Sequence, residues 1–465
     1  MNELTISLDA KASRPLYEQI YGYIKEEIKN GGLPFEERLP STRMLAKHLQ
    51  VSRSTVELAY EQLLSEGYIE AVPYRGYFVC QLDGLLHLEN QAVLMEVRQS
   101  EKKEKYAFDF SPNGIALNSF PHNTWRKLSR GILMEKDEEF FQLGNPQGEE
   151  FLRTTIASYL HHARGVSCTP DQVIVGAGSD YLLMLLSNIL GNRRVVAMEN
   201  PTYKRAYRVL QSMTKSMIAV EMDQNGMYVE ELSKSEADIA YVMPSHQYPM
   251  GIVMPVRRRM QLLDWAAKAE GRYIIEDDYD SEFRYKGKPI PALQGFDAKG
   301  KVIYLGTFSR VIAPSIRISY MVLPKALMKF YHERGRIFSS TVSKVDQMII
   351  AKFLNEGHYE RHLNRMRALY KSRHDVLLEE LGSLSDICKV SGENAGVHLL
   401  LHFTNGMSEA EAVSRAKEAG VKVYGLSDYC IGHEPEEATV LLGYANMEEE
   451  KIRSAVERLR DVWKQ

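Results

Sequence analysis

The first 80 residues show apolar positions at helical spacing in three short segments. In the first segment the apolar residues recur every four positions, at Leu16, Ile20, Ile24 and Ile28. This spacing predicts a helix that begins near Pro15 and ends at the Asn-Gly-Gly of residues 30–32. The apolar face of this helix requires partners from the segments that follow.

Two more helices are predicted over residues 41–50 and 52–66, because Ser41 and Ser52 are suitable N-terminal caps and Gly67 is a suitable stop. The side chains expected to face inward are Met44, Leu45, Leu49, Val56, Ala59, Leu63 and Leu64. Two β-type runs, 68–72 and 77–79, flank a Pro-Tyr-Arg-Gly turn and predict a hairpin. The predicted order is helix, helix, helix, hairpin, which is an α+β unit.

From residue 107 the pattern changes to apolar strands that alternate with long helices. Continuous apolar runs such as 195–198 and 302–305 are typical of parallel strands covered on both faces. The alternation predicts an α/β domain with a mostly parallel sheet, followed from about residue 350 by a smaller C-terminal α+β lobe. Residues 81–106 lose the periodicity and contain the charge-rich run EVRQSEKKEK, so the expected division is 1–80, a linker 81–106, and 107–465.

Composition favours a soluble protein of more than one domain. The chain has 465 residues, 44% apolar and 26% charged, and a formal net charge of −3, which excludes collagen-like and mainly disordered classes. Four widely spaced cysteines predict neither a disulfide scaffold nor a structural zinc site, and no metal is expected. With no signal peptide and no apolar run of membrane-spanning length, we expect a cytoplasmic protein without a membrane partner.

The second and third predicted helices begin with small polar and basic side chains that suit DNA. In a helix-turn-helix such residues contact base edges and phosphates. The candidate DNA contacts are Ser41, Thr42, Arg43, Ser52, Arg53, Ser54 and Thr55, with Arg75 and Gly76 at the hairpin tip. The alternative is a three-helix domain whose polar residues serve only as helix caps and which does not bind DNA. The charge balance favours caution, since residues 1–80 hold nine Lys and Arg against eleven Asp and Glu. The acidic residues lie mostly in the first helix and late in the third, so the contact face can still be positive.

The sequence of segments 14–33 and 39–79 resembles a GntR-type winged helix-turn-helix over nearly its whole length. RPLYEQIYGYIKEEIKNGGL and LPSTRMLAKHLQVSRSTVELAYEQLLSEGYIEAVPYRGYFV carry the matching positions in order. The resemblance implies a transcription factor whose dimer reads two half-sites of promoter DNA.

Residues 107–465 resemble a fold-type I aminotransferase, and the whole chain is similar to the MocR/GabR subfamily of regulators. The motifs are NPQGEEFLRTTIASYL, GAGSDYLLMLL, ENPTYKRAY, PSHQYPMG, YIIEDDYDSEF and GTFSRVIAPSIRISYMVLP. The resemblance implies pyridoxal 5′-phosphate as cofactor, an amino-acid or amine effector, and a homodimer. Taken singly, a glycine turn, an acidic strand end or a polar turn is more often structural than functional.

The resemblance also assigns roles to single residues. Gly178 and Ser179 lie at a strand-to-helix turn, where N–H groups and the helix dipole suit a phosphate. Asp277 would keep the pyridine nitrogen protonated, which makes the ring an electron sink. The other implied contacts are Tyr279 and His246 at the ring hydroxyl, Tyr203 near the cofactor, Ser309 and Arg317 at the phosphate, and Arg205 at a ligand carboxylate.

Arg310 stands where the family has a lysine after Ser309. The covalent link between enzyme and cofactor needs a neutral primary amine, whereas a guanidinium stays charged at any ordinary pH. The same lysine serves as the general base, so its absence removes both anchor and base. We expect no catalytic residue, little or no transaminase turnover, and a cofactor that binds without a covalent bond.

Two further departures concern ligand binding. Asn446 replaces an arginine that commonly clamps the substrate carboxylate, and an amide loses the bidentate, charge-assisted pairing. Asp180 follows the phosphate turn, where a carboxylate would repel a phosphate, so we expect it to point away and to stabilise the helix start.

Three functions remain open from the sequence. The preferred hypothesis is a DNA-binding regulator whose aminotransferase-like domain senses the cofactor or an effector. The second is a working aminotransferase with a DNA-binding appendage, against which Arg310 counts. The third is a DNA-binding dimer whose large domain binds no cofactor.

Overall fold

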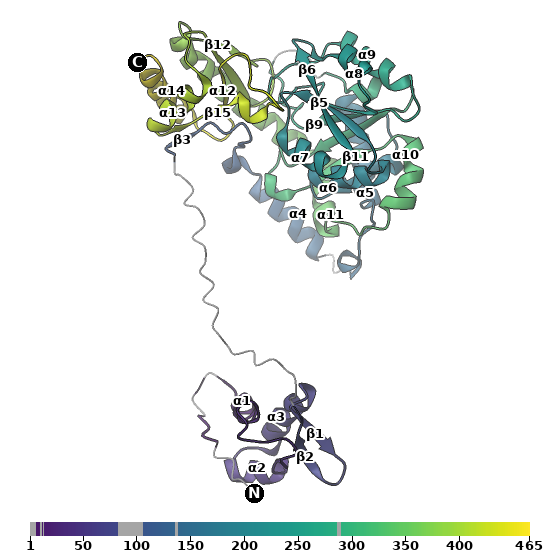
Figure 1. The fold of residues 1–465 in the computed structure, drawn as a ribbon, viewed down its shortest axis with the longest axis vertical. Coiled ribbons are helices and arrows are strands. Elements are labelled where there is room, and N and C mark those ends of the chain that lie inside the picture. The colour runs from purple at the N-terminus through teal and green to yellow at the C-terminus, as the bar shows by residue number, and fades with distance from the viewer. Residues whose placement is uncertain (1–5, 10–11, 13, 82–105, 135–137, 286–289) are drawn as a thin grey trace. The chain divides into compact units, whose positions relative to one another are not determined.

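The chain divides into two compact units, Met1–Lys103 and Glu104–Gln465 (Figure 1). The computed structural model describes residues 6–9, 12, 14–81, 106–134, 138–285 and 290–465. The linker expected over 81–106 therefore lies, apart from its two end residues, outside the described part of the chain.

The described residues of the first unit form three helices and one antiparallel hairpin, in the predicted order. Its elements are α1 (Leu16–Lys29), α2 (Thr42–Leu49), α3 (Arg53–Ser65), β1 (Ile69–Val72) and β2 (Gly76–Val79). The strands pair with Ile69 opposite Val79 and Val72 opposite Gly76. The core contains Ile20, Ile24 and Ile28 from α1 together with Leu45, Val56, Ala59 and Leu63.

One inward prediction for α2 is wrong. Met44 is 58% exposed, and the buried face of the helix is formed by Thr42, Leu45 and Ala46. Thr42, Leu45, Ala46 and Leu49 are spaced i, i+3, i+4 and i+7 and so share one face of the helix, whereas Met44 lies off that face. Leu49 and Leu64 lie at the edge of the core and are half-buried.

Two serine caps and one left-handed residue produce the tight turn between α2 and α3. The Ser41 hydroxyl accepts a hydrogen bond from the Met44 N–H at 3.3 Å, and the Ser52 hydroxyl accepts one from the Thr55 N–H at 3.1 Å. Gln50 adopts a φ of 54° at the end of α2, which reverses the chain before α3 begins. Each cap stabilises its helix by about 1 kcal/mol.

The second unit is built on an eight-stranded sheet of mixed direction. Its strands are β4 (Val173–Gly176), β5 (Val195–Asn200), β6 (Ser216–Asp223), β7 (Gly226–Met227), β8 (Ile239–Val242), β9 (Tyr273–Asp278), β10 (Val302–Thr307) and β11 (Ser319–Val322). The order is β4-β11-β10-β9-β8-β5-β6-β7. The pairs from β10 to β6 are parallel, whereas β11 runs antiparallel to both of its neighbours and β7 runs antiparallel to β6. The parallel centre follows the prediction, and the antiparallel edges make the sheet mixed.

Helices cover both faces of this sheet, which explains why its strands are apolar on both sides (Figure 1). One layer holds α6 (Ser179–Leu190), α7 (Lys204–Met213) and α10 (Lys325–Phe330), packed on Val196, Tyr241 and Ile275. The opposite layer holds α8 (Val229–Lys234) and α9 (Val256–Ala267), packed on the alternate residues Ala197, Ala240 and Ile274. The helices α4 (His122–Met134), α5 (Glu150–Arg164) and α11 (Lys344–Asn355) join a third cluster beside β4.

The C-terminal lobe contains a four-stranded antiparallel sheet. Its elements are α12 (His358–Leu381), β12 (Cys388–Ser391), β13 (His398–Phe403), α13 (Glu409–Glu418), β14 (Val421–Lys422), β15 (Tyr424–Gly425), β16 (Thr439–Gly443) and α14 (Glu449–Trp463). The sheet order is β12-β13-β16-β15, and β3 (Phe108–Asp109) pairs with β14, so the start of the unit joins its end. In the described part of the chain, no helix is both long and apolar enough to cross a membrane.

Candidate functional site

A cavity of about 410 Å³ lies at the carboxyl ends of the central strands of the second unit. This is the edge at which open α/β sheets bind ligands, because loops and helix N-termini converge there. Nine residues that the sequence assigned to the cofactor or the ligand line this cavity: Gly178, Ser179, Tyr203, Arg205, Asp277, Tyr279, Ser309, Arg310 and Arg317. They come from five separate segments of the chain.

One end of the cavity is suited to an anion. Gly178 precedes α6 with a φ of 92°, a conformation that favours glycine. A Cβ at this position would lie 2.5 Å from Arg317 Nη2, so only glycine allows the arginine to approach the helix N-terminus. Arg317 Nη2 also donates a hydrogen bond to the Ala177 carbonyl at 3.2 Å. The free N–H groups of α6 and this guanidinium converge on the same space.

Asp180 lies in this anion-binding end and does not point away from it, which corrects the expectation from the sequence. Its Oδ2 accepts a hydrogen bond from Arg205 Nη2 at 2.5 Å and one from Arg317 Nη2 at 3.3 Å. Asp180 also lines the cavity. Two arginines from α7 and the segment before β11 outweigh the preference of an acidic side chain to cap α6 from outside.

Asp277 lies at the end of β9 and is 8% exposed. Burial raises the pKa of its carboxyl to about 6, although a hydrogen bond from the Tyr241 hydroxyl acts in the opposite direction. Burial disfavours the ionised form of a carboxyl, and a nearby positive charge favours it. The Asp277 carboxyl is therefore suited to pairing with a positively charged group of a ligand.

Arg310 lines the same cavity. Its Nη2 donates a hydrogen bond to the Pro112 carbonyl at 2.6 Å. Within the described part of the chain, the buried Nε of Arg310 has no hydrogen-bond partner. An acceptor atom on a ligand in this cavity would satisfy that donor.

Aromatic side chains form the wall between the two ends. The Tyr203 and Tyr248 rings lie 5.8 Å apart, and the Tyr248 and Tyr279 rings also lie 5.8 Å apart. Tyr248 was missed from the sequence, although it stands directly before the Pro-Met-Gly that closes a motif singled out there. Tyr241, the partner of Asp277, was also missed, because it lies in the middle of an ordinary apolar strand, β8.

Two predicted ligand contacts lie outside the lining of the cavity. His246 is 2% exposed, and its Nδ1 lies 3.0 Å from both Asp280 oxygens and 2.9 Å from the Tyr279 hydroxyl. His246 is therefore placed to orient Tyr279 from behind. Asn446 is exposed and donates through Nδ2 to the Asp109 carbonyl at 3.1 Å.

The predicted DNA contacts lie on the first unit. Ser41, Arg43, Ser52, Arg53 and Ser54 are exposed at the starts of α2 and α3, and Thr55 is half-buried. Thr42 is only 7% exposed, so its side chain offers little surface to DNA. At the hairpin tip, Arg75 lies over the Phe78 ring at 5.3 Å, beside Gly76 with a φ of 110°. The adjacent Tyr74 is fully exposed and was not among the candidate contacts.

The cavity fits the chemistry of pyridoxal 5′-phosphate. Ser179 and Arg317, which Gly178 allows to approach the N-terminus of α6, suit the phosphate. Tyr203 and Tyr248 suit the faces of an aromatic ring, and the buried Asp277 suits a protonated ring nitrogen. The fold and the site thus define a fold-type I, aminotransferase-like domain.

Comparison with known families agrees with this assignment. The model of aminotransferase class I and II matches residues 113–459, and that of bacterial regulatory proteins of the gntR family matches residues 16–79. Among solved structures, the kynurenine aminotransferase of Pyrococcus horikoshii, in complex with PMP, is 25% identical. The alignment covers 78% of this chain and 91% of that chain, with a TM-score of 0.69.

Curated relatives match both units together. The HTH-type transcriptional regulator YdeL of Bacillus subtilis is 38% identical over 99% of this chain and 100% of its own length. The probable rhizopine catabolism regulatory protein MocR of Rhizobium meliloti is 32% identical over 98% and 95%. The pyridoxine biosynthesis regulator PdxR of Corynebacterium glutamicum is 29% identical over 99% and 98%. The chain belongs to the MocR-type family, DNA-binding transcriptional regulators in which a GntR-type winged helix is joined to an aminotransferase-like domain.

Proposed function

We propose that the second unit of this regulator senses pyridoxal 5′-phosphate, alone or together with an amino-acid or amine effector, and holds it without a covalent bond. The observation that carries the proposal is one cavity that combines an anion end at Gly178 and Arg317, a buried Asp277, and Arg310, which we propose stands in place of the family lysine. The resemblance to PMP-complexed and PLP-dependent folds and the name of the PdxR relative support it.

The residues of this chain would divide the work of binding. The phosphate would be bound by Arg317, Ser179, Ser309 and the N-terminus of α6. Asp277 would keep the pyridine nitrogen protonated, and Tyr279 would contact the ring hydroxyl. When bound, pyridoxal phosphate supplies an aldehyde and an electron-withdrawing ring. Arg205 is the residue we propose for an effector carboxylate, which would compete with Asp180 for its guanidinium.

Arg310 explains why sensing is favoured over catalysis. A guanidinium neither condenses with the aldehyde nor accepts a proton at neutral pH, so anchor and general base are both missing. In the described structure its Nη2 is already engaged by the Pro112 carbonyl. We therefore propose turnover that is very low or absent.

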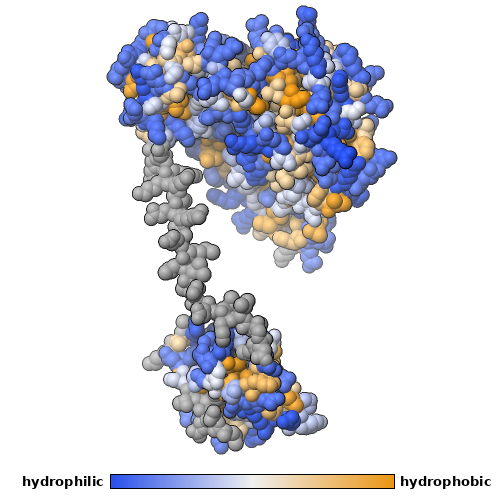
Figure 2. All heavy atoms as spheres, in the orientation of Figure 1, coloured by the Kyte–Doolittle hydropathy of each residue, from blue (hydrophilic) through white to orange (hydrophobic). Residues whose placement is uncertain are grey.

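We further propose that the regulator acts as a cytoplasmic homodimer, with DNA-binding residues 1–80, linker 81–106 and sensor residues 107–465. An apolar surface supports dimerisation, and Figure 2 shows apolar side chains exposed at the end of the second unit near α4 and α11. The exposed apolar residues are Leu133 and Met134 at the end of α4, Phe141 and Leu143 in the segment after it, and Ile337 and Phe338 in the segment before α11. Monomeric proteins seldom expose such patches. The two winged helices of a dimer would read the two half-sites through the residues at the starts of α2 and α3.

The proposal is tested by titrating the purified protein and Arg310→Lys with pyridoxal phosphate, with absorbance and tryptophan fluorescence as readouts and borohydride to trap any covalent bond. We expect saturable binding to both proteins and a borohydride-trapped product only with Arg310→Lys. Operator binding is measured by gel shift with and without the cofactor, and a change in affinity is expected. An amino donor tested beside them should be consumed by neither protein at an appreciable rate.

Two outcomes would overturn the proposal. Steady amino-donor consumption by the unchanged protein would establish a working aminotransferase with a DNA-binding appendage. Absence of cofactor binding in both proteins would indicate a domain that binds no cofactor, which the occupation of the anion end by Asp180 favours as the second candidate. A ligand that binds only the folded state also raises its melting temperature, which gives an independent check.

A further inference from the structure

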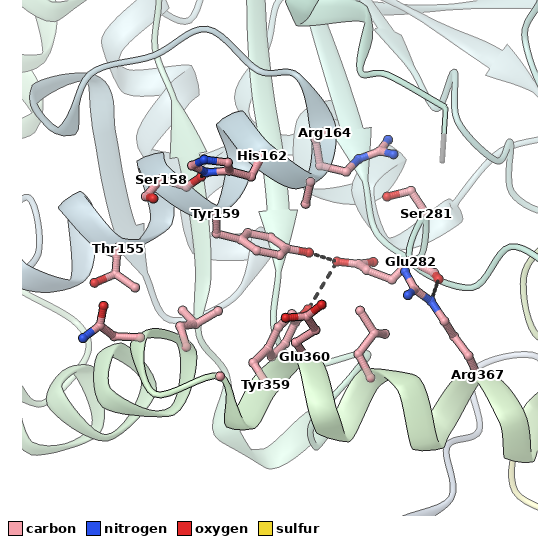
Figure 3. Close-up of a pocket in the computed structure, with 15 residues that line it drawn as sticks. Thr155, Ser158, Tyr159, His162, Arg164, Ser281, Glu282, Tyr359, Glu360 and Arg367 are labelled. Carbon is pink, nitrogen blue, oxygen red and sulfur yellow. Dashed lines mark hydrogen bonds between the residues drawn. The ribbon is translucent and has the colours of Figure 1, made fainter. Parts of the chain in front are cut away.

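A second cavity, of about 500 Å³, lies between α5, the first half of α12 and the residues that follow β9 (Figure 3). None of its described lining residues belongs to the cofactor cavity. Its polar lining includes Tyr159, His162 and Arg164 from α5, Glu282 after β9, and Tyr359, Glu360 and Arg367 from α12. Cavities of this size accommodate small organic ligands.

The Glu282 carboxylate is the centre of this cavity's polar lining. Figure 3 shows the hydroxyls of Tyr159 and Tyr359 directed at it, and both donate to the same oxygen, Oε1, at 3.0 and 3.3 Å. Within the described residues no Lys, Arg or His forms an ion pair with Glu282. Burial and the nearby Asp278 raise the pKa of this carboxyl, and Arg164, which forms its ion pair with Asp278, lowers it only in part.

The charges that surround Glu282 are matched elsewhere. Arg164 forms a buried ion pair with Asp278 at 2.8 Å and donates to the Ser245 hydroxyl at 2.7 Å. Arg367 donates through Nε to the backbone carbonyl of Glu282 at 2.7 Å and does not contact its carboxylate. With Glu360 at the same cavity, the described lining holds two carboxylates against one unmatched guanidinium.

We propose that this cavity binds a small organic cation, whose primary ammonium group donates hydrogen bonds to the Glu282 carboxylate. An ammonium ion supplies both the missing positive charge and the donors that a carboxylate accepts. The Tyr159 and Tyr359 rings lie 5.4 Å apart and provide aromatic surface, which attracts cations. The matching ligand class is an alkylamine or diamine.

The second site adjoins the cofactor site through one short segment. Asp277 and Tyr279 line the first cavity, while Ser281 and Glu282 line the second. In the same segment, Asp278, next to Asp277, accepts hydrogen bonds from Arg164 and from the Tyr304 hydroxyl. A cation bound at Glu282 therefore changes the charge next to the segment that carries Asp277. The proposed site itself does not depend on cofactor binding.

The test uses the full-length protein freed of pyridoxal phosphate, titrated with n-butylammonium chloride by calorimetry, with sodium butyrate as the comparison ligand. We expect saturable binding of n-butylammonium with a dissociation constant of about 1 mM, as befits a ligand of so few atoms, and none of butyrate. Glu282→Gln should weaken binding at least tenfold. The matched control Glu231→Gln, at an exposed position on α8, should bind as the unchanged protein does.

A second variant keeps the test decisive if Glu282→Gln folds poorly. Ser158 is exposed on α5 and lines the cavity, so Ser158→Trp would fill part of the cavity and leave the Glu282 carboxylate and its two tyrosine partners unchanged. Binding should be lost in Ser158→Trp while the melting temperature stays near that of the unchanged protein. The proposal is overturned if n-butylammonium does not bind, if Glu282→Gln or Ser158→Trp binds it with unchanged affinity, or if Asp277→Asn alone abolishes binding.

Discussion

Asp180 and Arg317 form an ion pair at the N-terminus of α6, with 3.3 Å between Oδ2 and Nη2. The same carboxylate oxygen also binds Arg205 Nη2 at 2.5 Å. Arg317 is 137 positions and Arg205 is 25 positions from Asp180 in the sequence. Both contact its carboxylate at the place where a phosphate is expected to bind. Asp180 behaves as an internal substitute for the anion, and any phosphate must displace it or bind beside it.

Asp180→Asn is therefore expected to strengthen the binding of pyridoxal phosphate. Removing the negative charge releases Arg317 and removes repulsion, which should lower the dissociation constant roughly tenfold, about 1.4 kcal/mol. The measurement is a fluorescence titration at constant ionic strength. Asp171→Asn is the matched control, because the Asp171 side chain is 95% exposed and faces Arg153 instead. Equal affinities of the Asp180→Asn and parent proteins would mean that the phosphate binds elsewhere.

Tyr241→Phe should weaken cofactor binding most strongly at low pH. The hydroxyl of Tyr241 lowers the pKa of Asp277, which burial raises to about 6, so its removal raises that pKa further. A protonated Asp277 no longer pairs with a protonated ring nitrogen, and affinity falls as pH drops through the pKa. We expect the midpoint of a cofactor-affinity profile between pH 5 and 8 to move to higher pH.

The matched control for this profile is Tyr304→Phe. Tyr304 donates its hydroxyl to Asp278, the neighbour of Asp277, from the adjacent strand β10. Both variants remove one buried hydroxyl beside one carboxylate. A shift of similar size in Tyr304→Phe would contradict a specific role for the pair of Tyr241 and Asp277.

Arg43→Gln should reduce operator affinity in a salt-dependent manner. Arg43 is exposed at the start of α2, next to the Ser41 cap, where a guanidinium reaches a phosphate. Loss of one phosphate contact should lower the slope of log affinity against log salt by about one. Fluorescence anisotropy at several salt concentrations measures this slope. Lys29→Gln removes the same charge from α1, outside the proposed contacts, and should leave the slope unchanged.

Glu199→Gln should remove one source of pH-dependent stability. Glu199 is 1% exposed on β5, and burial raises its pKa to about 7. As pH falls from 8 to 6, the folded protein takes up a proton at Glu199 while the unfolded chain, whose pKa is near 4.3, does not. Between pH 8 and pH 6, the free energy of unfolding of the parent should therefore rise by about 1 kcal/mol relative to that of the variant.

Urea unfolding of parent and variant at pH 6, 7 and 8 measures this difference. The other buried carboxyls with a raised pKa, among them Glu276, titrate in both proteins and cancel in the comparison. Glu230→Gln, an exposed substitution on α8, should show a difference that does not vary with pH. If the difference in free energy of unfolding between parent and Glu199→Gln also does not vary with pH, Glu199 stays ionised in the folded protein.

Most of the secondary structure could be predicted, because local signals determine it. Ser41 and Ser52 cap helices as their sequence context predicts, and the apolar runs of β5 and β10 form buried central strands. Met44 shows the limit of this reasoning. In a helix of two turns, the apolar positions fit more than one stripe, and contact with α1 and α3 decides which stripe is buried.

The sequence by itself determined what Arg310 is able to do, since the charge of a guanidinium depends on its own chemistry and on no neighbour. It also determined which residue types stand at the strand ends. Only the tertiary structure decided that Asp180 meets Arg317, that Tyr241 meets Asp277, and that Tyr159 and Tyr359 meet at Glu282. These partners are between 36 and 137 residues apart. Hydrogen bonds and ion pairs depend on distances of a few ångströms, and only the packing of helices on the sheet sets such distances.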